Sequence, residues 1–367
     1  MSGGGPVVSF EIINTLASMG HKVTVLTPNV TWTGKNYLPR IHENVKVVRV
    51  ETPSKDNLKV AARRCKNNLQ KIGEQLGKET RFDFIFTIFH PFHLVPNAAV
   101  SCAKKLGIPA IVKLDDAVYE KSSGIKSIQR RIEKVFASKS LHAATKILVA
   151  NQNTKGIVHN FYNVQNEKLV IVPNGVNISL FKKSHNRKRI VIFSGMMYYH
   201  RGLDVLLGVI PNILKHVHDA KFVLLGDGPE MSKLKNIVKE KGIESSVEFK
   251  GWIEREEIPN YLEEASIGIG PLKLTTVTSQ ALPIKVLEYM ASSLPIIAKK
   301  GTLPEDVLVD NKNGYFIDSE EELSKKIVEL LTNPELVNNM GKISFEMVQK
   351  FSWESIVNSI LEISKSN

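Results

Sequence analysis

The sequence predicts an α/β protein of two domains, each with a parallel β-sheet covered by helices on both faces. Short β-branched runs alternate with longer helical patterns along the whole chain, as in sheets whose strands are joined by helices. The length of 367 residues exceeds one ordinary core and fits two domains of typical size. With 43% hydrophobic and 23% charged residues, both domains are expected to fold.

The first half alternates candidate strands with candidate helices. The strands are expected at 22–26, 45–50, 84–88, 110–113 and 146–150, and the helices at 7–19, 57–76, 95–106 and 125–142. No strand pattern precedes the glycines at 3–5, although a doubly wound domain normally opens with a strand. The first N-terminal strand of this domain is therefore expected to be missing.

A second series of strands begins after the turn-rich residues 172–175, and these strands are expected at 190–193, 221–225, 247–249, 267–269 and 295–298. We place the first domain at 1–172 and the second at 173–350. Two such Rossmann-like domains are expected to face a cleft, and ligands of open α/β sheets bind at the carboxyl ends of the strands.

Composition narrows the class of partner. Cys65 and Cys102 lack the paired spacing of a zinc site or a disulfide scaffold, and no apolar run approaches the roughly 18 residues that span a bilayer. A cytoplasmic protein is therefore expected.

The net charge of +12 favours an anionic partner, such as a phosphorylated small molecule or an acidic membrane surface. No nucleic acid is expected, because basic residues are not interleaved with aromatic ones and no recognition helix is visible.

Residues 193–195 end a predicted buried strand with Gly195 and lead through Arg201 to a helix. Arg201 would lie near the N-terminus of that helix, where a guanidinium and free backbone N–H groups can bind a diphosphate. A solvated loop arginine is the alternative. Gly4 and Gly5 could similarly bring backbone N–H groups close to a phosphate or sugar, or could belong to a flexible leader.

Lys285 and Glu288 follow Pro283 at a probable helix start. Their spacing puts an ammonium and a carboxylate on one face of the helix. A carboxylate can accept two hydrogen bonds from the vicinal diol of a ribose, and a lysine can hold phosphate. An ordinary surface ion pair would show the same spacing.

Five short motifs together resemble glycosyltransferase family 4. They occur in the family's order: VPNGVN at 172–177, SG at 194–195 with RGLDVLL at 201–207, GDGPE at 226–230, GWI at 251–253, and PIKVLEYMA at 283–291. The resemblance implies a GT-B fold with residues 351–367 as a helix packing back on the first domain. It also implies retaining transfer from a nucleotide-diphosphate sugar, without a metal or other cofactor.

The resemblance assigns roles to donor-binding residues. Glu288 matches the glutamate that binds donor ribose, and Arg201 stands where the family usually has a diphosphate-binding lysine. Ile253 falls in the loop that lies against the nucleotide base. Gly4 and Gly5 match the family's glycine-rich loop.

Three positions depart from the family pattern, and at each of them the charge of the side chain changes. Met196 replaces an arginine that many members carry, and Lys285 can compensate for it in members with a Pro-x-Lys-x-x-Glu-Tyr-Met motif. Gln280 replaces the first glutamate of the family's pair, so an amide would contact the sugar. Asp115 stands where a histidine is usual and is a candidate base, and His90 is a candidate for contacting acceptor or donor sugar.

The chemical class of the acceptor is inferred from the basic character of the first domain. Its helices carry a cluster of cations suited to anionic lipid, namely Arg63, Arg64, Lys66, Lys126, Arg130, Arg131, Lys134 and Lys139. We expect a glycan or lipid-linked acceptor and peripheral attachment to the inner face of the membrane, with solvated helix faces as the alternative. A catalytically silent nucleotide-sugar-binding protein and a nucleotide-sugar epimerase remain competing functions. A nicotinamide dehydrogenase is not expected, because no Gly-x-Gly-x-x-Gly follows a strand.

Overall fold

The computed structural model describes residues 4–28, 41–51, 58–89, 94–114, 125–182 and 187–366, with the backbone alone at 4–6, 58–64 and 125–133. Within these ranges the chain forms two compact α/β units. One comprises Met1–Pro173 with Trp353–Asn367, and the other Asn174–Ser352. The boundary therefore falls at Pro173, and the last helix belongs to the first unit.

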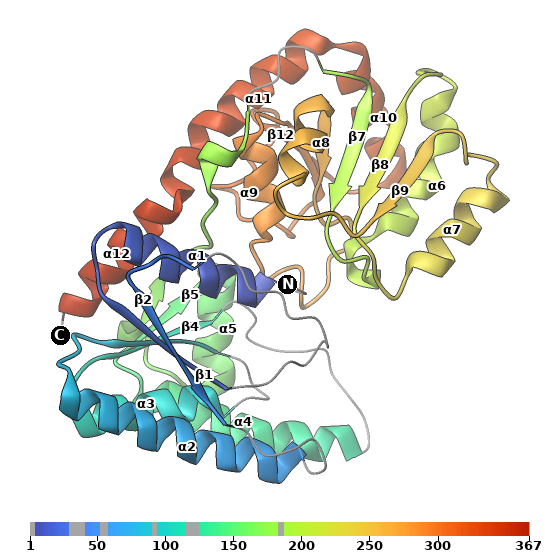
Figure 1. The fold of residues 1–367 in the computed structure, drawn as a ribbon. Helices are drawn as coiled ribbons and strands as arrows, with labels where there is room; N and C mark the ends of the chain where they lie inside the picture. The colour runs from blue at the N-terminus through green and yellow to red at the C-terminus, as the bar shows by residue number, and fades with distance from the viewer. Residues whose placement is uncertain are drawn as a thin grey trace. The chain divides into compact units, whose positions relative to one another are not determined.

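The described part of the first unit contains two parallel sheets. One pairs β1 (Val23–Pro28) with β2 (Val45–Val50), and the other has the order β3 (Ile85–Ile88), β4 (Ala110–Leu114), β5 (Lys146–Val149) and β6 (Leu169–Ile171). The helices are α1 (Gly4–Ser18), α2 (Leu58–Glu79), α3 (Val95–Leu106), α4 (Ile125–Ala143), α5 (Gln152–Tyr162) and α12 (Trp353–Lys365), with a 3₁₀ turn η1 at Asn166–Lys168. In Figure 1, α1 lies beside α12.

One expectation for this unit is wrong. Gly4 and Gly5 were predicted to form a loop before the first helix, but they form the first turn of α1. The first turn of a helix makes no intrahelical N–H bonds, so glycine costs less there than in the helix interior. The sequence pattern could not separate a glycine-rich loop from a glycine-rich helix start.

The second unit, as far as it is described, contains a six-stranded parallel sheet. Its spatial order is β12 (Gly314–Ile317), β11 (Ile296–Lys299), β10 (Ile267–Ile269), β7 (Ile190–Ser194), β8 (Lys221–Leu225) and β9 (Val247–Gly251). The helices are α6 (Leu203–Leu214), α7 (Met231–Glu240), α8 (Ile258–Glu264), α9 (Ile284–Ala291), α10 (Glu320–Thr332) and α11 (Pro334–Val348), with 3₁₀ turns η2 (Ile178–Leu180), η3 (Tyr199–Arg201) and η4 (Gln349–Phe351). The fold class predicted from the sequence is confirmed.

Side chains of the sheet alternate between two cores, as the period of a strand requires. Val191 and Phe193 of β7 point into the core covered by α6, α7 and α10, whereas Ile192 between them points into the core of α8 and α9. Figure 1 shows these helices on opposite faces of the sheet. Burial on both faces explains why the strands read as continuous apolar runs.

Strand order reverses between β7 and β10. From β7 the chain proceeds outward to β8 and β9, and it then returns to β10 and proceeds the other way through β11 and β12. Ligands of open α/β sheets bind beyond the strand ends at such a switch point. The loops after β7 and β10 are therefore where a site is expected.

Among the residues that the structure describes, no helix combines the length and the apolar character needed to cross a membrane.

Candidate functional site

Glycines allow the loops after β7 and β8 to touch backbone to backbone. Gly195 has φ +125° and Gly226 has φ +117°, and a Cβ at Gly226 would overlap the carbonyl oxygen of Gly195. Gly195 N–H donates to Leu225 O at 2.9 Å, and Met197 N–H donates to Asp227 O at 2.8 Å. No side chain projects from position 195 at the end of β7, and the atom nearest to the place of the missing Cβ is Lys285 Nζ.

Lys285 is buried at this strand end. It lies in the first turn of α9, whose N-cap is Pro283, and only 7% of the residue is exposed. Its Nζ lies 3.5 Å from the centre of the Phe193 ring and 3.4 Å from the place that a Cβ on Gly195 would occupy. The ammonium has no hydrogen-bond partner among the described residues. Burial of this kind makes the charged form of the amine costly in the free protein, and an anionic ligand would stabilise that form.

Burial has the largest influence on the pKa values of Lys285 and its neighbour His200. Burial lowers its pKa well below the usual range, the Arg201 cation lowers it further, and Glu288 opposes them. Burial also lowers the pKa of His200 to about 4, with smaller contributions from Arg201 and Lys285. An anion bound beside Lys285 and Arg201 would favour the charged form of Lys285.

Glu288 lies one turn after Lys285 on α9 and is also 7% exposed. A surface ion pair, the alternative left open by the sequence, is excluded because both residues are buried. The neighbouring Tyr289 fixes this helix, since its hydroxyl accepts the Ser194 N–H at 2.8 Å. The carboxylate and the ammonium are thus held on one short helix against the end of β7.

Arg201 lies where the sequence predicts it, directly before α6. It ends the turn η3 and is half-buried. The helix N-cap is Gly202, with φ +73°, and Arg201 O accepts the Leu272 N–H at 3.0 Å. The structure therefore brings together four predicted site residues, Gly195, Arg201, Lys285 and Glu288, at the switch point of one sheet.

Arg187 supports the site and was not identified from the sequence. Its guanidinium donates to Ala265 O at 2.7 Å and to Ser292 O and Ser293 O at 2.9 Å. These last two carbonyls end α9, where a cation is favoured by the helix dipole. Burial lowers the pKa of Arg187 to about 10. In the sequence it is only one cation of a basic segment, so no pattern marks it.

Gln280 and Ile253 have different surroundings. Gln280 is almost fully buried, and its Nε2 donates to the carbonyl of Thr276 within the same loop. Ile253 is half-buried and packs against the core of α8 and α9. Its neighbour Trp252 is exposed. His90 and Asp115 lie outside the described residues, and Gly4 and Gly5 lie in α1 of the first unit.

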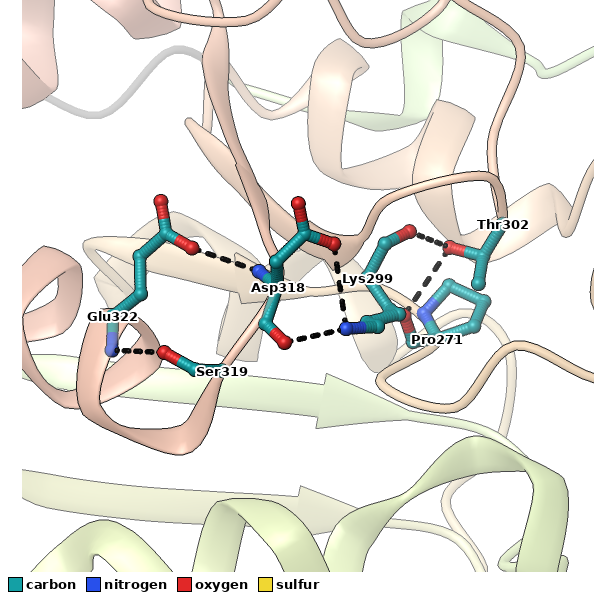
Figure 2. A network of polar contacts seen from close by, with 6 residues as sticks. All are labelled: Pro271, Lys299, Thr302, Asp318, Ser319 and Glu322. Atoms are coloured by element: carbon teal, nitrogen blue, oxygen red, sulfur yellow. Dashed lines mark hydrogen bonds and ion pairs between the residues drawn. The ribbon is translucent and has the colours of Figure 1, made fainter.

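A polar network fixes the loop that follows β10. Pro271 O accepts Lys299 N–H at 2.8 Å and Thr302 Oγ1 at 3.2 Å. Figure 2 shows how Lys299 continues the network, because its Nζ donates to Asp318 O at 2.6 Å. Asp318 N–H in turn donates to Glu322 at 2.7 Å, at the start of α10. The beginning of the 271–282 loop is therefore anchored to the ends of β11 and β12.

In the part of the chain that the structure describes, no three His, Cys, Asp or Glu side chains converge as metal ligands would. A doubly wound parallel sheet with buried charged side chains at its switch point is typical of a nucleotide-binding domain. A profile of the family described as "Glycosyltransferase Family 4" matches residues 2–180, and one described as "Glycosyl transferases group 1" matches residues 177–347. The chain belongs to this family of glycosyltransferases, as the sequence motifs predicted.

Characterised and uncharacterised relatives agree with this assignment. The chain is 27% identical over 302 residues to an uncharacterized glycosyltransferase of Methanocaldococcus jannaschii, covering 81% of this chain and 79% of the relative. It is 22% identical over 265 residues to an alpha-monoglucosyldiacylglycerol synthase of Acholeplasma laidlawii, covering 66% of this chain and 65% of that protein. Its fold resembles that of HepE from Anabaena in complex with UDP-glucose, with a TM-score of 0.76, 15% identity and coverage of 100% and 97%.

Proposed function

We propose that this enzyme transfers a hexose from a nucleotide-diphosphate sugar to a glycan or lipid-linked acceptor, with retention of anomeric configuration and without a metal. The observation that carries the proposal is the buried Lys285 side chain, whose Nζ has no hydrogen-bond partner among the described residues and lies beside Phe193 and Gly195 at the end of β7. A diphosphate is the ligand whose charge best matches Lys285 together with Arg201. Glu288 would accept hydrogen bonds from the ribose diol.

The same cations would serve catalysis. When the bond between the sugar and the diphosphate breaks, negative charge grows on the leaving phosphate oxygens. Lys285 and Arg201 are fixed cations that would stabilise this charge, which is the role of a metal ion in other transferases. HepE was solved with UDP-glucose, which supports a donor of this chemical class. Gln280, Asp115 and His90 remain catalytic candidates on the strength of the family motifs.

A lipid-linked acceptor is supported by the first unit and by a relative. The name of the Acholeplasma enzyme indicates a diacylglycerol glycolipid. On α4 and α5, Val135, Phe136 and Phe161 are exposed, and Lys134 Nζ lies 4.2 Å from the centre of the Phe161 ring. Apolar side chains beside cations suit peripheral attachment to anionic lipid on the cytoplasmic face.

The membrane proposal is tested by sedimentation with vesicles containing an acidic lipid at low salt. Wild-type protein should co-sediment, and Phe136→Ser should reduce the bound fraction. Leu180→Ser, which changes an exposed apolar residue of the second unit, serves as the matched control. Equal sedimentation of both variants, or no binding by the wild type, would argue against attachment through this surface.

The transferase proposal is tested by nucleotide release from UDP-, GDP- and ADP-sugars, with a membrane extract as acceptor and EDTA present. Wild type should release nucleotide only with the extract, and Glu288→Ala should abolish release. Glu240→Ala, at an exposed position of α7, is the control for loss of a carboxylate. Donor turnover without acceptor would indicate an epimerase, and donor binding without release a silent binding protein. The anomeric configuration of the product tests retention.

A further inference from the structure

An ion pair joins the loop after β10 to the helix that follows Arg201. Lys273 Nζ lies 2.6 Å from Asp204 Oδ2 and 3.9 Å from the centre of the Tyr199 ring. Asp204 lies in the first turn of α6, and Tyr199 lies in η3. Both charged side chains are largely shielded, with 19% of Lys273 and 24% of Asp204 exposed. The pair is therefore less screened than one on an open surface.

The backbone on both sides of this ion pair is closely packed. Leu272 N–H donates to Arg201 O at 3.0 Å. A Cβ at Gly202 would lie 2.9 Å from Leu272 Cβ and 3.1 Å from Lys273 Cγ. The turn bearing Arg201 and the start of the 271–282 loop thus touch without room for a side chain between them.

Hydrogen bonds between residues of the loop hold together the segment that begins at Lys273. Thr278 Oγ1 donates to Lys273 O at 2.7 Å and accepts Thr275 N–H at 2.8 Å. Gln280 Nε2 donates to the carbonyl of Thr276. Three residues after Gln280, Pro283 begins α9, which carries the buried ammonium and carboxylate. A displacement at Lys273 would therefore move the loop as one piece.

We infer that Lys273 is a positioning residue, which together with Asp204 holds the 271–282 loop against the Arg201 turn so that the diphosphate meets its cations in fixed places. The inference rests on the donor site proposed above. Prearranged charges do not have to be ordered when the ligand arrives, so losing the tether weakens binding without removing any group that touches the ligand.

Lys233 provides a matched control, because it approaches the same two partners from another element. Its Nζ lies 3.8 Å from Asp204 Oδ2, 3.2 Å from Glu230 and 5.7 Å from the centre of the Tyr199 ring. It belongs to α7, and 52% of its side chain is exposed. Removing Lys233 deletes a cation at Asp204 but leaves the loop after β10 attached.

Calorimetry first shows which of UDP, GDP and ADP the wild type binds. It then measures the affinity for that nucleotide in wild type, Lys273→Met, Lys233→Met, Asp204→Asn and the two double variants with Asp204→Asn. Lys273→Met should weaken binding about 10-fold or more, and Lys273→Arg should recover most of the loss. Lys273→Met and Asp204→Asn should be strongly non-additive, whereas Lys233→Met should leave affinity unchanged. Additive effects of Lys273→Met and Asp204→Asn in folded variants would overturn the inference.

Hydrogen exchange separates this inference from the proposed function. If wild type binds none of UDP, GDP and ADP, the donor-site proposal fails, and the tether is then judged on hydrogen exchange alone. Amide exchange of residues 272–280 should be faster in Lys273→Met than in Lys233→Met, because the Leu272 N–H loses its fixed carbonyl partner. Equal exchange in the two variants would show that Lys273 does not hold the loop.

Discussion

The hydroxyl of Tyr289 accepts the backbone N–H of Ser194 at 2.8 Å, which joins helix α9 to the last residue of strand β7. Tyr289 is fully buried, and burial raises the pKa of its phenol. Just beyond the same end of the helix, Arg187 donates to the carbonyls of Ser292 and Ser293. The C-terminal half of the helix that carries Lys285 and Glu288 is thus held by two sets of polar contacts.

Replacing Tyr289 with phenylalanine should lower the free energy of unfolding by about 1–3 kcal/mol, because it leaves the Ser194 N–H buried without its acceptor. Chemical denaturation would measure the change. Tyr261→Phe, at a half-buried position of α8, should change stability by less than about 0.5 kcal/mol. A Tyr289→Phe variant as stable as wild type would show that the hydrogen bond contributes little.

Replacing Lys285 with methionine should separate stability from binding. Methionine matches the shape of the side chain and removes a buried cation without a hydrogen-bond partner among the described residues, so the melting temperature should stay the same or rise. UDP affinity should fall about 10- to 100-fold, equivalent to roughly 1.5–3 kcal/mol for a charge-assisted hydrogen bond.

Lys235→Met removes an exposed cation of α7 and serves as the control for Lys285→Met. Lys235→Met should change neither the melting temperature nor the affinity for UDP. A clear drop in the melting temperature of Lys285→Met would instead mean that the ammonium is needed for folding.

The fold was predictable because its signal is repeated along the chain. Strand runs such as 221–225 and 267–269 match β8 and β10, since buried parallel strands consist of continuous apolar residues. Strand β12 was missed, because Gly314–Ile317 is only four residues long and follows a polar turn. Helix α10, which follows β12, does begin with a recognisable N-cap, because Ser319 Oγ accepts the Glu322 N–H at 3.1 Å.

The positions of the candidate site residues were predictable where a motif coincides with a strand end or a helix start. Arg201, Lys285 and Glu288 combine a charged side chain with a strand end or a helix start. Arg187 and Gly226 depend on what they touch in three dimensions, namely the end of α9 and the backbone of Gly195. Contacts between residues far apart in the chain leave no periodic trace in one sequence, so neither role could be inferred.

The stability of the protein should depend on His200 at acidic pH. Its pKa is lowered to about 4 in the folded state by burial, Arg201 and Lys285, against about 6.5 in the unfolded chain. Between these values the unfolded state binds more protons, so the free energy of unfolding should rise with pH across this window. Urea unfolding of wild type and His200→Asn should be measured from pH 4 to 7. As the pH rises, the free energy of unfolding of wild type should increase relative to that of the variant.

His218→Asn, at an exposed position, controls for the loss of an imidazole in that titration. It should follow wild type at every pH. If the difference in free energy of unfolding between His200→Asn and wild type stays constant from pH 4 to 7, the protonated form of His200 is not destabilised by its surroundings.

The contact between Gly226 and Gly195 should make Gly226→Ala severely destabilising. A Cβ there overlaps the carbonyl oxygen of Gly195, and φ of +117° is a backbone conformation that alanine rarely adopts. Gly242 is the matched control, because it has φ +63° with nothing within 4 Å of an added Cβ. Gly242→Ala should cost about 1 kcal/mol from the left-handed backbone alone, whereas Gly226→Ala should cost at least about 3 kcal/mol or prevent folding. Denaturation of both variants compares the two costs directly. Equal costs would mean that the loops after β7 and β8 can separate, and the backbone at the end of β7 beside Lys285 would then not be a fixed feature of the site.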